Sequence, residues 1–168
     1  MSSDNDDAIA GLVARVAGSL EARGESLVAA ESCTGGLIAA ACTDRAGSSV
    51  WFDRGFVTYA DDAKMDCLSV AKDTIVTHGA VSETVVRAMC TGALAASTAD
   101  WSVAVSGIAG PGGGSNDKPV GTVVIGWQRR GEAPEALVYH FDGDRGAVRS
   151  ASVCKALAGL ERRLAVAE

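Results

Sequence analysis

Hydrophobic residues recur at intervals of three and four along three segments of the chain, and each of these segments is predicted to be an amphipathic helix. The first covers residues 8–23, the second runs from Ser82, a favoured N-cap residue, to about Ser97, and the last begins after Gly143. In each helix the hydrophobic positions would lie on one face and pack against a common core. The inward-facing positions are predicted to be Ile9, Leu12, Val13, Val16 and Leu20, then Val85, Val86, Met89, Cys90 and Leu94, then Val148, Val153, Leu157, Leu160 and Leu164.

Shorter apolar runs that lack helical spacing are predicted to be β-strands. The last two runs are separated by only a short polar stretch, so they are expected to pair as an antiparallel hairpin. The predicted strands cover residues 26–30, 52–60, 101–110, 120–128 and 135–141.

Two further helices are expected between these strands. Small apolar residues continue at helical spacing over 34–44, and Asp61 can cap a helix over 62–68, with Lys64 in its first turn. Strands that alternate with helices, together with one hairpin, predict a layered α/β/α domain with a mixed sheet. Residues 8–168 are expected to form this single domain, and the acidic residues 1–7 are expected to be disordered.

The composition is that of a globular protein and excludes several classes of function. The chain has 168 residues, of which 48% are hydrophobic, and a net charge of −6, which argues against non-specific nucleic-acid binding. No apolar run approaches the roughly 20 residues that span a bilayer, and the acidic amino terminus does not resemble a secretory signal. Five cysteines without a CxxC pair indicate reduced thiols of a cytoplasmic protein. His78 and His140 have no ligand-like neighbours, so no metal site is predicted.

The stretch "ESCTGG" (31–36) places a carboxylate, two hydroxyls and a thiol where a buried strand becomes a helix. The first N–H groups of a helix have no internal partner. The polar side chains can therefore be simple caps, or the joint can hold an anion or a developing oxyanion.

Lys64 allows two interpretations. It can be a solvated lysine on a helix surface, or it can be the general base for a serine. A lysine has a pKa of about 10.4, so keeping it neutral at pH 7 costs roughly 4–5 kcal/mol. Burial or the positive end of its own helix would lower that cost. Tyr59, just before this helix, can orient Lys64 or relay a proton, or it can be half-buried packing.

Three other polar stretches carry similar ambiguities. Ser48 and Ser49 follow Gly47 in a predicted turn, where serine is also ordinary. The loop "SGIAGPGGG" (106–114) matches no dinucleotide fingerprint, but its backbone can approach a ring or a phosphate. The stretch "GDRGAVR" (143–149) opens the last helix and places two arginines on one face. These arginines can form a phosphate site, or they can simply be surface charge.

Taken together, "AESCTGGLIAAACTDRAGSSVWFDRGFVTYADDAK", "HGAVSE", "VSGIAGPGGG", "KPVGTV" and "GDRGAVR" resemble the CinA carboxy-terminal domain family, which includes nicotinamide mononucleotide deamidases. The resemblance runs from about residue 8 to 165. It implies hydrolysis of the carboxamide of nicotinamide mononucleotide (NMN) to nicotinate mononucleotide and ammonia. It also implies a serine–lysine mechanism without metal or cofactor, and a homo-oligomer, expected to be a dimer. We expect this protein to lack the amino-terminal domain of larger family members, and with it any pyrophosphatase activity attached to that domain.

By motif, the resemblance implies catalytic roles for Ser32, Ser49, Tyr59 and Lys64, and substrate binding by Thr34, Gly35, Gly36, Ser106, Gly107, Gly110 and Arg145. Two positions depart from the usual family pattern. "ADDAK" replaces the commoner "SNEAK" but keeps the tyrosine and the lysine, and position 106 is serine where many members have threonine, so the hydroxyl is kept.

The nucleophile is expected to be Ser49 rather than Ser32. A nucleophile needs rotational freedom and contact with its base, here Lys64, and a serine in a turn after glycine is expected to have both, whereas Ser32 has a competing role as a helix cap. Two other functions stay open: a nucleotide-binding domain with little catalysis, and a protein-interaction module. The intact hydroxyls and Lys64 favour the amidase, because a pure binding domain needs no neutral lysine.

Overall fold

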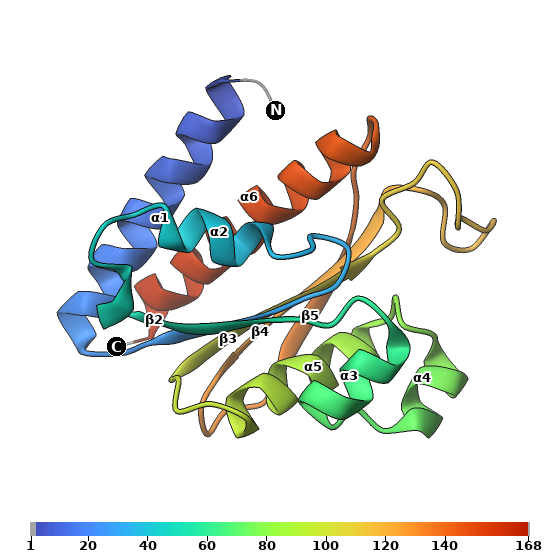
Figure 1. Ribbon diagram of the computed structural model, residues 1–168, viewed down its shortest axis with the longest axis horizontal. Coiled ribbons are helices and arrows are strands. Elements are labelled where there is room, and N and C mark those ends of the chain that lie inside the picture. The colour runs from blue at the N-terminus through green and yellow to red at the C-terminus, as the bar shows by residue number, and fades with distance from the viewer. Residues whose placement is uncertain (1–2, 168) are drawn as a thin grey trace.

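The computed structural model describes residues 3–167 and shows one mixed β-sheet between two layers of helices (Figure 1). The sheet has five strands in the order β2-β1-β3-β4-β5. β1 pairs in parallel with β2 and with β3, whereas β3–β4 and β4–β5 are antiparallel. The strands are β1 (Leu27–Glu31), β2 (Phe52–Val57), β3 (Trp101–Gly107), β4 (Thr122–Arg129) and β5 (Glu135–His140).

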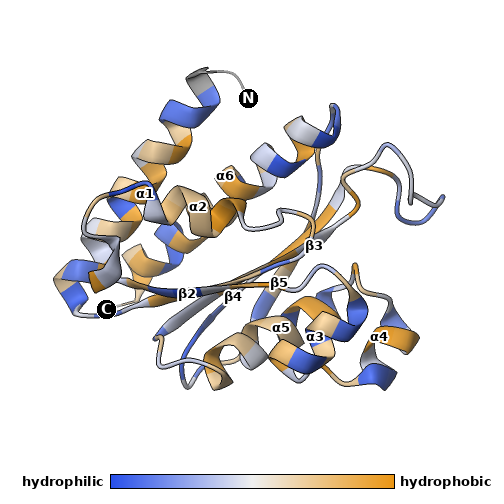
Figure 2. Cartoon of the chain, viewed as in Figure 1, coloured by the Kyte–Doolittle hydropathy of each residue, from blue (hydrophilic) through white to orange (hydrophobic). Residues whose placement is uncertain are grey.

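One face of the sheet is covered by α1 (Ser3–Arg23), α2 (Leu37–Thr43) and α6 (Arg145–Val166) (Figure 1). Hydrophobic and hydrophilic residues alternate along α1 and α6, as an amphipathic helix requires (Figure 2). The hydrophobic side chains of this layer meet Leu27, Ala29 and other residues of the sheet in one buried cluster. All the inward-facing positions predicted for the first and last helices belong to that cluster.

The opposite face is covered by α3 (Asp61–Leu68), α4 (Lys72–His78) and α5 (Glu83–Ala95) (Figure 1). These helices and the other side chains of the strands form the second hydrophobic cluster. α3 and α5 come together at Gly92, where a Cβ atom would lie 1.9 Å from the carbonyl oxygen of Leu68. Only glycine allows this approach, so Gly92 sets how closely the end of α3 packs on α5.

The α/β/α layers, the mixed sheet and the final hairpin are confirmed, but several helices differ from the sequence prediction. α3 begins at Asp61 itself, with Ala60 at the N-cap position and no side-chain cap, so the predicted capping role of Asp61 is wrong. α2 begins at Leu37 rather than at 34, because Gly35 and Gly36 have φ values of +59° and +95° and end the preceding turn in left-handed conformations. α4 was not predicted: it is seven residues long, and only Ile75 in it is buried.

The amino terminus also differs. α1 starts at Ser3, so residues 3–7 are helical rather than disordered, and residues 1–2 lie outside the described part of the chain. The Asn5 amide donates to the Ser150 hydroxyl of α6, and Asp6 and Asp7 lie in the first two turns, where negative charge favours a helix.

Candidate active site

A cavity of about 210 Å³ opens at the carboxyl ends of β1 and β3. In α/β sheets ligands bind at such strand ends. The lining residues come from the ends of β1, β2 and β3 and the segments that follow them, from α3, from the segment before α5 and from the first turn of α6. They include Ser32, Cys33, Tyr59, Lys64, Ser106 and Arg145.

The centre of this cavity holds a lysine–serine pair. The Nζ atom of Lys64 lies 3.1 Å from Oγ of Ser32, within hydrogen-bond distance. Lys64 is only 1% exposed and Ser32 only 8%. A nucleophile and its base need this contact, so the geometry suits activation of the Ser32 hydroxyl.

Two backbone carbonyls hold the amine in place. Lys64 Nζ donates to the carbonyl oxygen of Thr58 at 2.8 Å and to that of Tyr59 at 3.3 Å. A neutral amine has two N–H bonds and one lone pair. With both N–H bonds directed at carbonyls, the lone pair is left for the hydroxyl proton of Ser32.

Burial lowers the pKa of Lys64, against a smaller opposing effect of the nearby Asp61 carboxylate. The lowered pKa increases the fraction of neutral amine at physiological pH, as a general base requires. The interpretation of Lys64 as a solvated surface lysine does not fit this placement.

The neighbouring thiol does not compete with Ser32. Cys33 is 5% exposed, and burial raises the pKa of its thiol to about 11. A thiol of that pKa is protonated at neutral pH, and the protonated form is a poor nucleophile.

Glu31, the last residue of β1, has a fully buried carboxylate that caps α2. Its Oε2 accepts from the backbone N–H groups of Gly36 and Ile38, both at 3.1 Å, and its Oε1 accepts from that of Ala39 at 2.9 Å. The expectation that the start of this helix offers free N–H groups to the substrate is therefore wrong for these three. The sequence pattern alone assigns no role to Glu31.

Arg145 and Tyr59 meet at the mouth of the cavity. The Arg145 guanidinium donates to the carbonyl oxygen of Gly110 at 2.8 Å and to the phenol oxygen of Tyr59 at 2.7 Å. The phenol thus lies on Arg145, and Tyr59 reaches Lys64 only through its backbone carbonyl.

Of the other predicted binding residues, two line the cavity, whereas Thr34, Gly35, Gly36 and Gly110 are not among its lining residues. Ser106 and Gly107 line it, and the buried Ser106 hydroxyl donates to the carbonyl oxygen of Ala80 at 2.8 Å. Thr34 is fully buried and lies in the turn that Gly35 and Gly36 complete.

Comparison with known proteins gives one consistent answer. The family model for the CinA C-terminal domain matches residues 9–164. The chain belongs to the CinA C-terminal domain family. A curated relative from Escherichia coli (strain K12), named nicotinamide-nucleotide amidohydrolase PncC, is 50% identical over 90% of this chain and 92% of its own length. A CinA-like protein of Geobacter sulfurreducens is 46% identical over 98% of this chain, which spans 39% of that protein.

Solved structures agree with this CinA-domain assignment. The crystal structure of the competence damage-inducible protein A from Klebsiella pneumoniae has a TM-score of 0.92 and 44% identity, over 95% of this chain and 99% of that one. The competence/damage inducible protein CihA from Agrobacterium tumefaciens has a TM-score of 0.90 and 45% identity, over 94% and 96% of the two chains. The layered α/β fold is therefore that of solved CinA proteins.

Ser49 of this CinA domain lies away from the cavity, which corrects the expected contact with Lys64. It is exposed and lies in a short 3-10 helix, Ser48–Val50, that precedes β2, whereas Lys64 follows β2. A six-residue strand spans about 20 Å, so Ser49 lies at the amino end of the sheet and Lys64 beyond its carboxyl end.

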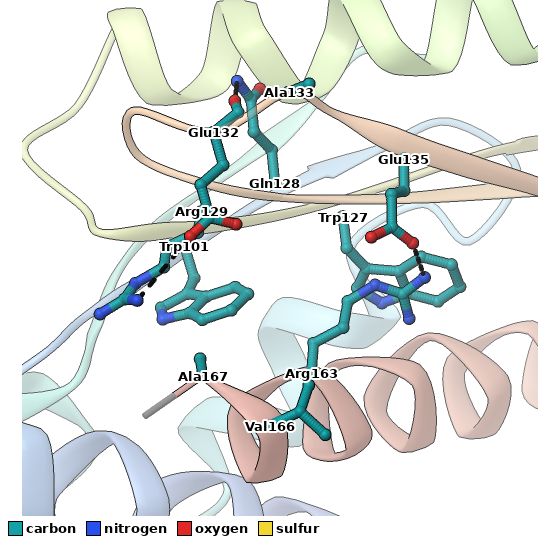
Figure 3. A pocket seen from close by; sticks show the side chains of 10 residues that line it. All are labelled: Trp101, Trp127, Gln128, Arg129, Glu132, Ala133, Glu135, Arg163, Val166 and Ala167. Carbon is teal, nitrogen blue, oxygen red and sulfur yellow. Dashed lines mark hydrogen bonds and ion pairs between the residues drawn. The ribbon is translucent and has the colours of Figure 1, made fainter.

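A second cavity, of about 260 Å³, lies at the amino end of the sheet, against the end of α6 (Figure 3). Its charged groups are already paired: Arg163 with Glu135 at 2.6 Å, and Arg129 with Glu25 at 2.7 Å. Arg163 also stacks 3.9 Å above the ring of Trp127. No nucleophile paired with a base lies among its lining residues, which distinguishes it from the Ser32 cavity.

Among residues 3–167 of this CinA domain, no group of three or more histidine, cysteine or acidic residues is placed to hold a metal ion. All five cysteines have free thiols. No described helix has both the length and the apolar character needed to cross a bilayer.

Proposed function

We propose that this protein hydrolyses the carboxamide of NMN, producing nicotinate mononucleotide and ammonia. The observation that carries the proposal is the buried contact of 3.1 Å between Lys64 Nζ and Ser32 Oγ. Relatives named nicotinamide-nucleotide amidohydrolase, such as the PncC protein of Escherichia coli, support the choice of substrate.

In the proposed mechanism Ser32 is the nucleophile. Its Oγ attacks the carboxamide carbon while Lys64 takes the hydroxyl proton, which gives a tetrahedral intermediate. The protonated Lys64 then gives this proton to the leaving nitrogen, and the C–N bond breaks to release ammonia and an acyl-enzyme. Water, activated by the neutral Lys64, hydrolyses the ester and restores Ser32.

Arg145 is the proposed partner of the phosphate group. It lies at the mouth of the cavity in the first turn of α6, where a guanidinium and free backbone N–H groups can bind an anion together. Tyr59 holds Arg145 there through its phenol oxygen. Ser106 and Gly107 line the cavity with Ser32 and are proposed to contact the substrate, and Gly110 accepts a hydrogen bond from Arg145. Thr34, Gly35 and Gly36 form the turn after Ser32, and Ser49 is proposed to take no part in bond making.

The cellular setting is part of the same proposal. The reaction would serve pyridine nucleotide salvage in the cytoplasm, where free thiols such as the five in this chain persist. The active protein is proposed to be a homodimer that needs no metal or cofactor.

The test is ammonia release from NMN by the purified protein, with and without a chelator. We expect equal turnover under both conditions. Binding of NMN without ammonia release would instead support the alternative, a nucleotide-binding CinA domain without catalysis. Activity that the chelator abolishes would contradict the metal-free mechanism.

A further inference from the structure

The turn after Ser32 leaves two of its backbone N–H groups without a protein partner. Ser32 N donates to Val105 O, Gly35 N to Ser32 O, and Leu37 N to Thr34 O. The N–H groups of positions 36, 38 and 39 are taken by the Glu31 carboxylate. Within the described residues, only Cys33 and Thr34 in the stretch 32–40 donate no backbone hydrogen bond.

These two N–H groups belong to buried residues, since Cys33 is 5% exposed and Thr34 is 0% exposed. The hydroxyl of Thr34 is buried as well, and it has no hydrogen-bond partner among residues 3–167. An unpartnered buried donor costs about 1–3 kcal/mol, and such groups are rare in folded proteins. Three of them in two consecutive residues, directly after a candidate nucleophile, indicate a site for an acceptor that arrives with the substrate.

Arg149 fixes the orientation of the same turn from the side of α6. Its Nε donates to the carbonyl oxygen of Cys33 at 3.1 Å, and its Nη2 donates to that of Thr34 at 3.0 Å. In a trans peptide the C=O and the following N–H point in opposite directions. Because Arg149 binds the carbonyl oxygen of Cys33, the Thr34 N–H points away from the guanidinium.

We propose that the backbone N–H groups of Cys33 and Thr34 bind the oxyanion of the tetrahedral intermediate, and that Glu31 and Arg149 are the residues that position them. This inference rests on the proposed amidase function. When Ser32 Oγ forms its bond to the carboxamide carbon, the C=O π pair moves onto the carbonyl oxygen. That oxygen then accepts hydrogen bonds from the residue after the nucleophile and from its neighbour, as in other acyl-transfer enzymes.

Glu31 has a defined part in this arrangement. By taking the N–H groups at the start of α2, its carboxylate keeps that helix end from competing for the oxyanion. It also ties β1 to α2 across the turn, with bonds to residues five, seven and eight positions further on. Glu31 binds N–H groups of this segment and Arg149 binds its carbonyl oxygens, and neither residue lines the cavity.

The first experiment uses an NMN analogue in which a boronic acid replaces the carboxamide. Addition of Ser32 to boron gives a tetrahedral anion that resembles the intermediate. In ¹H–¹⁵N spectra we expect the amide protons of Cys33 and Thr34 to move downfield, and those of Ile38 and Ala39 to stay. A tetrahedral adduct that leaves the Cys33 and Thr34 amides unmoved would overturn the inference, as would failure to form an adduct in protein that hydrolyses NMN.

The second experiment measures the kinetics of Arg149→Lys and Arg149→Met with NMN. We expect kcat to fall by about 10–100-fold, less than the 10²–10³ for losing an oxyanion donor outright, with KM changed less than about threefold. Lysine should restore part of the loss. Arg15→Met is the matched control, because Arg15 pairs only with Glu161 on the surface. A change confined to KM, or a loss in folded Arg149→Met no larger than that of the control, would overturn the positioning role.

Different results would contradict the proposed function and the oxyanion assignment. If the wild-type protein releases no ammonia from NMN, the proposed function is wrong and the oxyanion assignment falls with it. If turnover is normal but the amide shifts or the kcat effect are missing, only the assignment of Cys33, Thr34 and Arg149 is wrong.

Discussion

Arg145 donates a hydrogen bond to the phenol oxygen of Tyr59 at 2.7 Å, although the two residues lie 86 positions apart in the chain. Tyr59 follows β2 and precedes α3, and Arg145 opens α6, so this contact joins the two helix layers at the mouth of the cavity. Tyr59 remains 59% exposed, which leaves the pair accessible to a ligand from solvent.

The Arg145→Ala variant should raise KM for NMN far more than KM for nicotinamide riboside, which lacks the phosphate. The reason is that a charge-assisted bond to phosphate is lost only with the nucleotide. Steady-state ammonia release with both substrates measures the difference. Tyr59→Phe, which keeps the guanidinium, is the control and should have the smaller effect. An equal rise for both substrates would remove Arg145 from phosphate binding.

The Lys64→Met variant should lower kcat by at least about 100-fold, because general-base catalysis is typically worth about 10²–10⁴. The fold should persist, since methionine fills much of the same buried volume without an amine to solvate. Circular dichroism and turnover measured on one preparation test both points. Lys72→Met, an exposed lysine at the start of α4, should stay active. A folded Lys64→Met protein with most of its activity would exclude the lysine base.

The pH dependence of stability should reveal the buried amine. Because burial lowers the pKa of Lys64 in the folded protein, the unfolded chain binds its proton more tightly. The free energy of unfolding should therefore rise with pH between the lowered pKa and the ordinary lysine pKa, and Lys64→Met should lack this rise. Urea denaturation of both proteins at several alkaline pH values gives the difference. Parallel curves would mean that the pKa of Lys64 is not lowered.

The activity should follow the same titration in the same direction. Only neutral Lys64 can accept the Ser32 proton, so kcat/KM should increase as the pH rises through the lowered pKa of the folded enzyme. A profile that falls over that range, in protein that stays folded, would argue that the protonated lysine is the active form.

Ser32→Ala should abolish the covalent intermediate, whereas Ser49→Ala should leave it and change turnover little, as an exposed serine outside the cavity predicts. Rapid-quench mass spectrometry with NMN, followed by peptide mapping, locates the nicotinoyl group. An adduct found on Ser49 in the Ser32→Ala protein would restore Ser49 as nucleophile.

The sequence predicted the layers because they follow local rules, whereas the candidate site came from the family motifs. Runs of apolar residues define the strands, and polar residues at the ends of parallel strands share one edge of the sheet. Ser32 and Ser106 were assigned to the site by their family motifs, and both follow parallel strands and line the cavity. The same rule carried a signal that was missed for Ser49: it precedes its strand, so it belongs at the opposite edge from the segment that follows β2.

Other features depend on contacts that no spacing reveals. The Glu31 carboxylate could be seen at the joint, but its three N–H partners exist only because two glycines turn the chain back over it. Arg145 and Arg149 were correctly placed on one face of α6. Their different partners, a phenol at the cavity mouth and carbonyls of the turn, follow from the packing of α6 on the sheet.

The close approach at Gly92 means that a residue outside the cavity helps to set the position of Lys64. α3 carries Lys64, and the end of α3 lies against the bare backbone of α5 at this glycine. Any larger residue at 92 would push α3 outward and carry the amine away from Ser32. Substitutions at position 92 should therefore be tolerated as poorly as substitutions at position 64, although Gly92 does not line the cavity. Sequence variation in this domain would therefore be limited by the residues that position Lys64 as well as by the residues that contact the substrate.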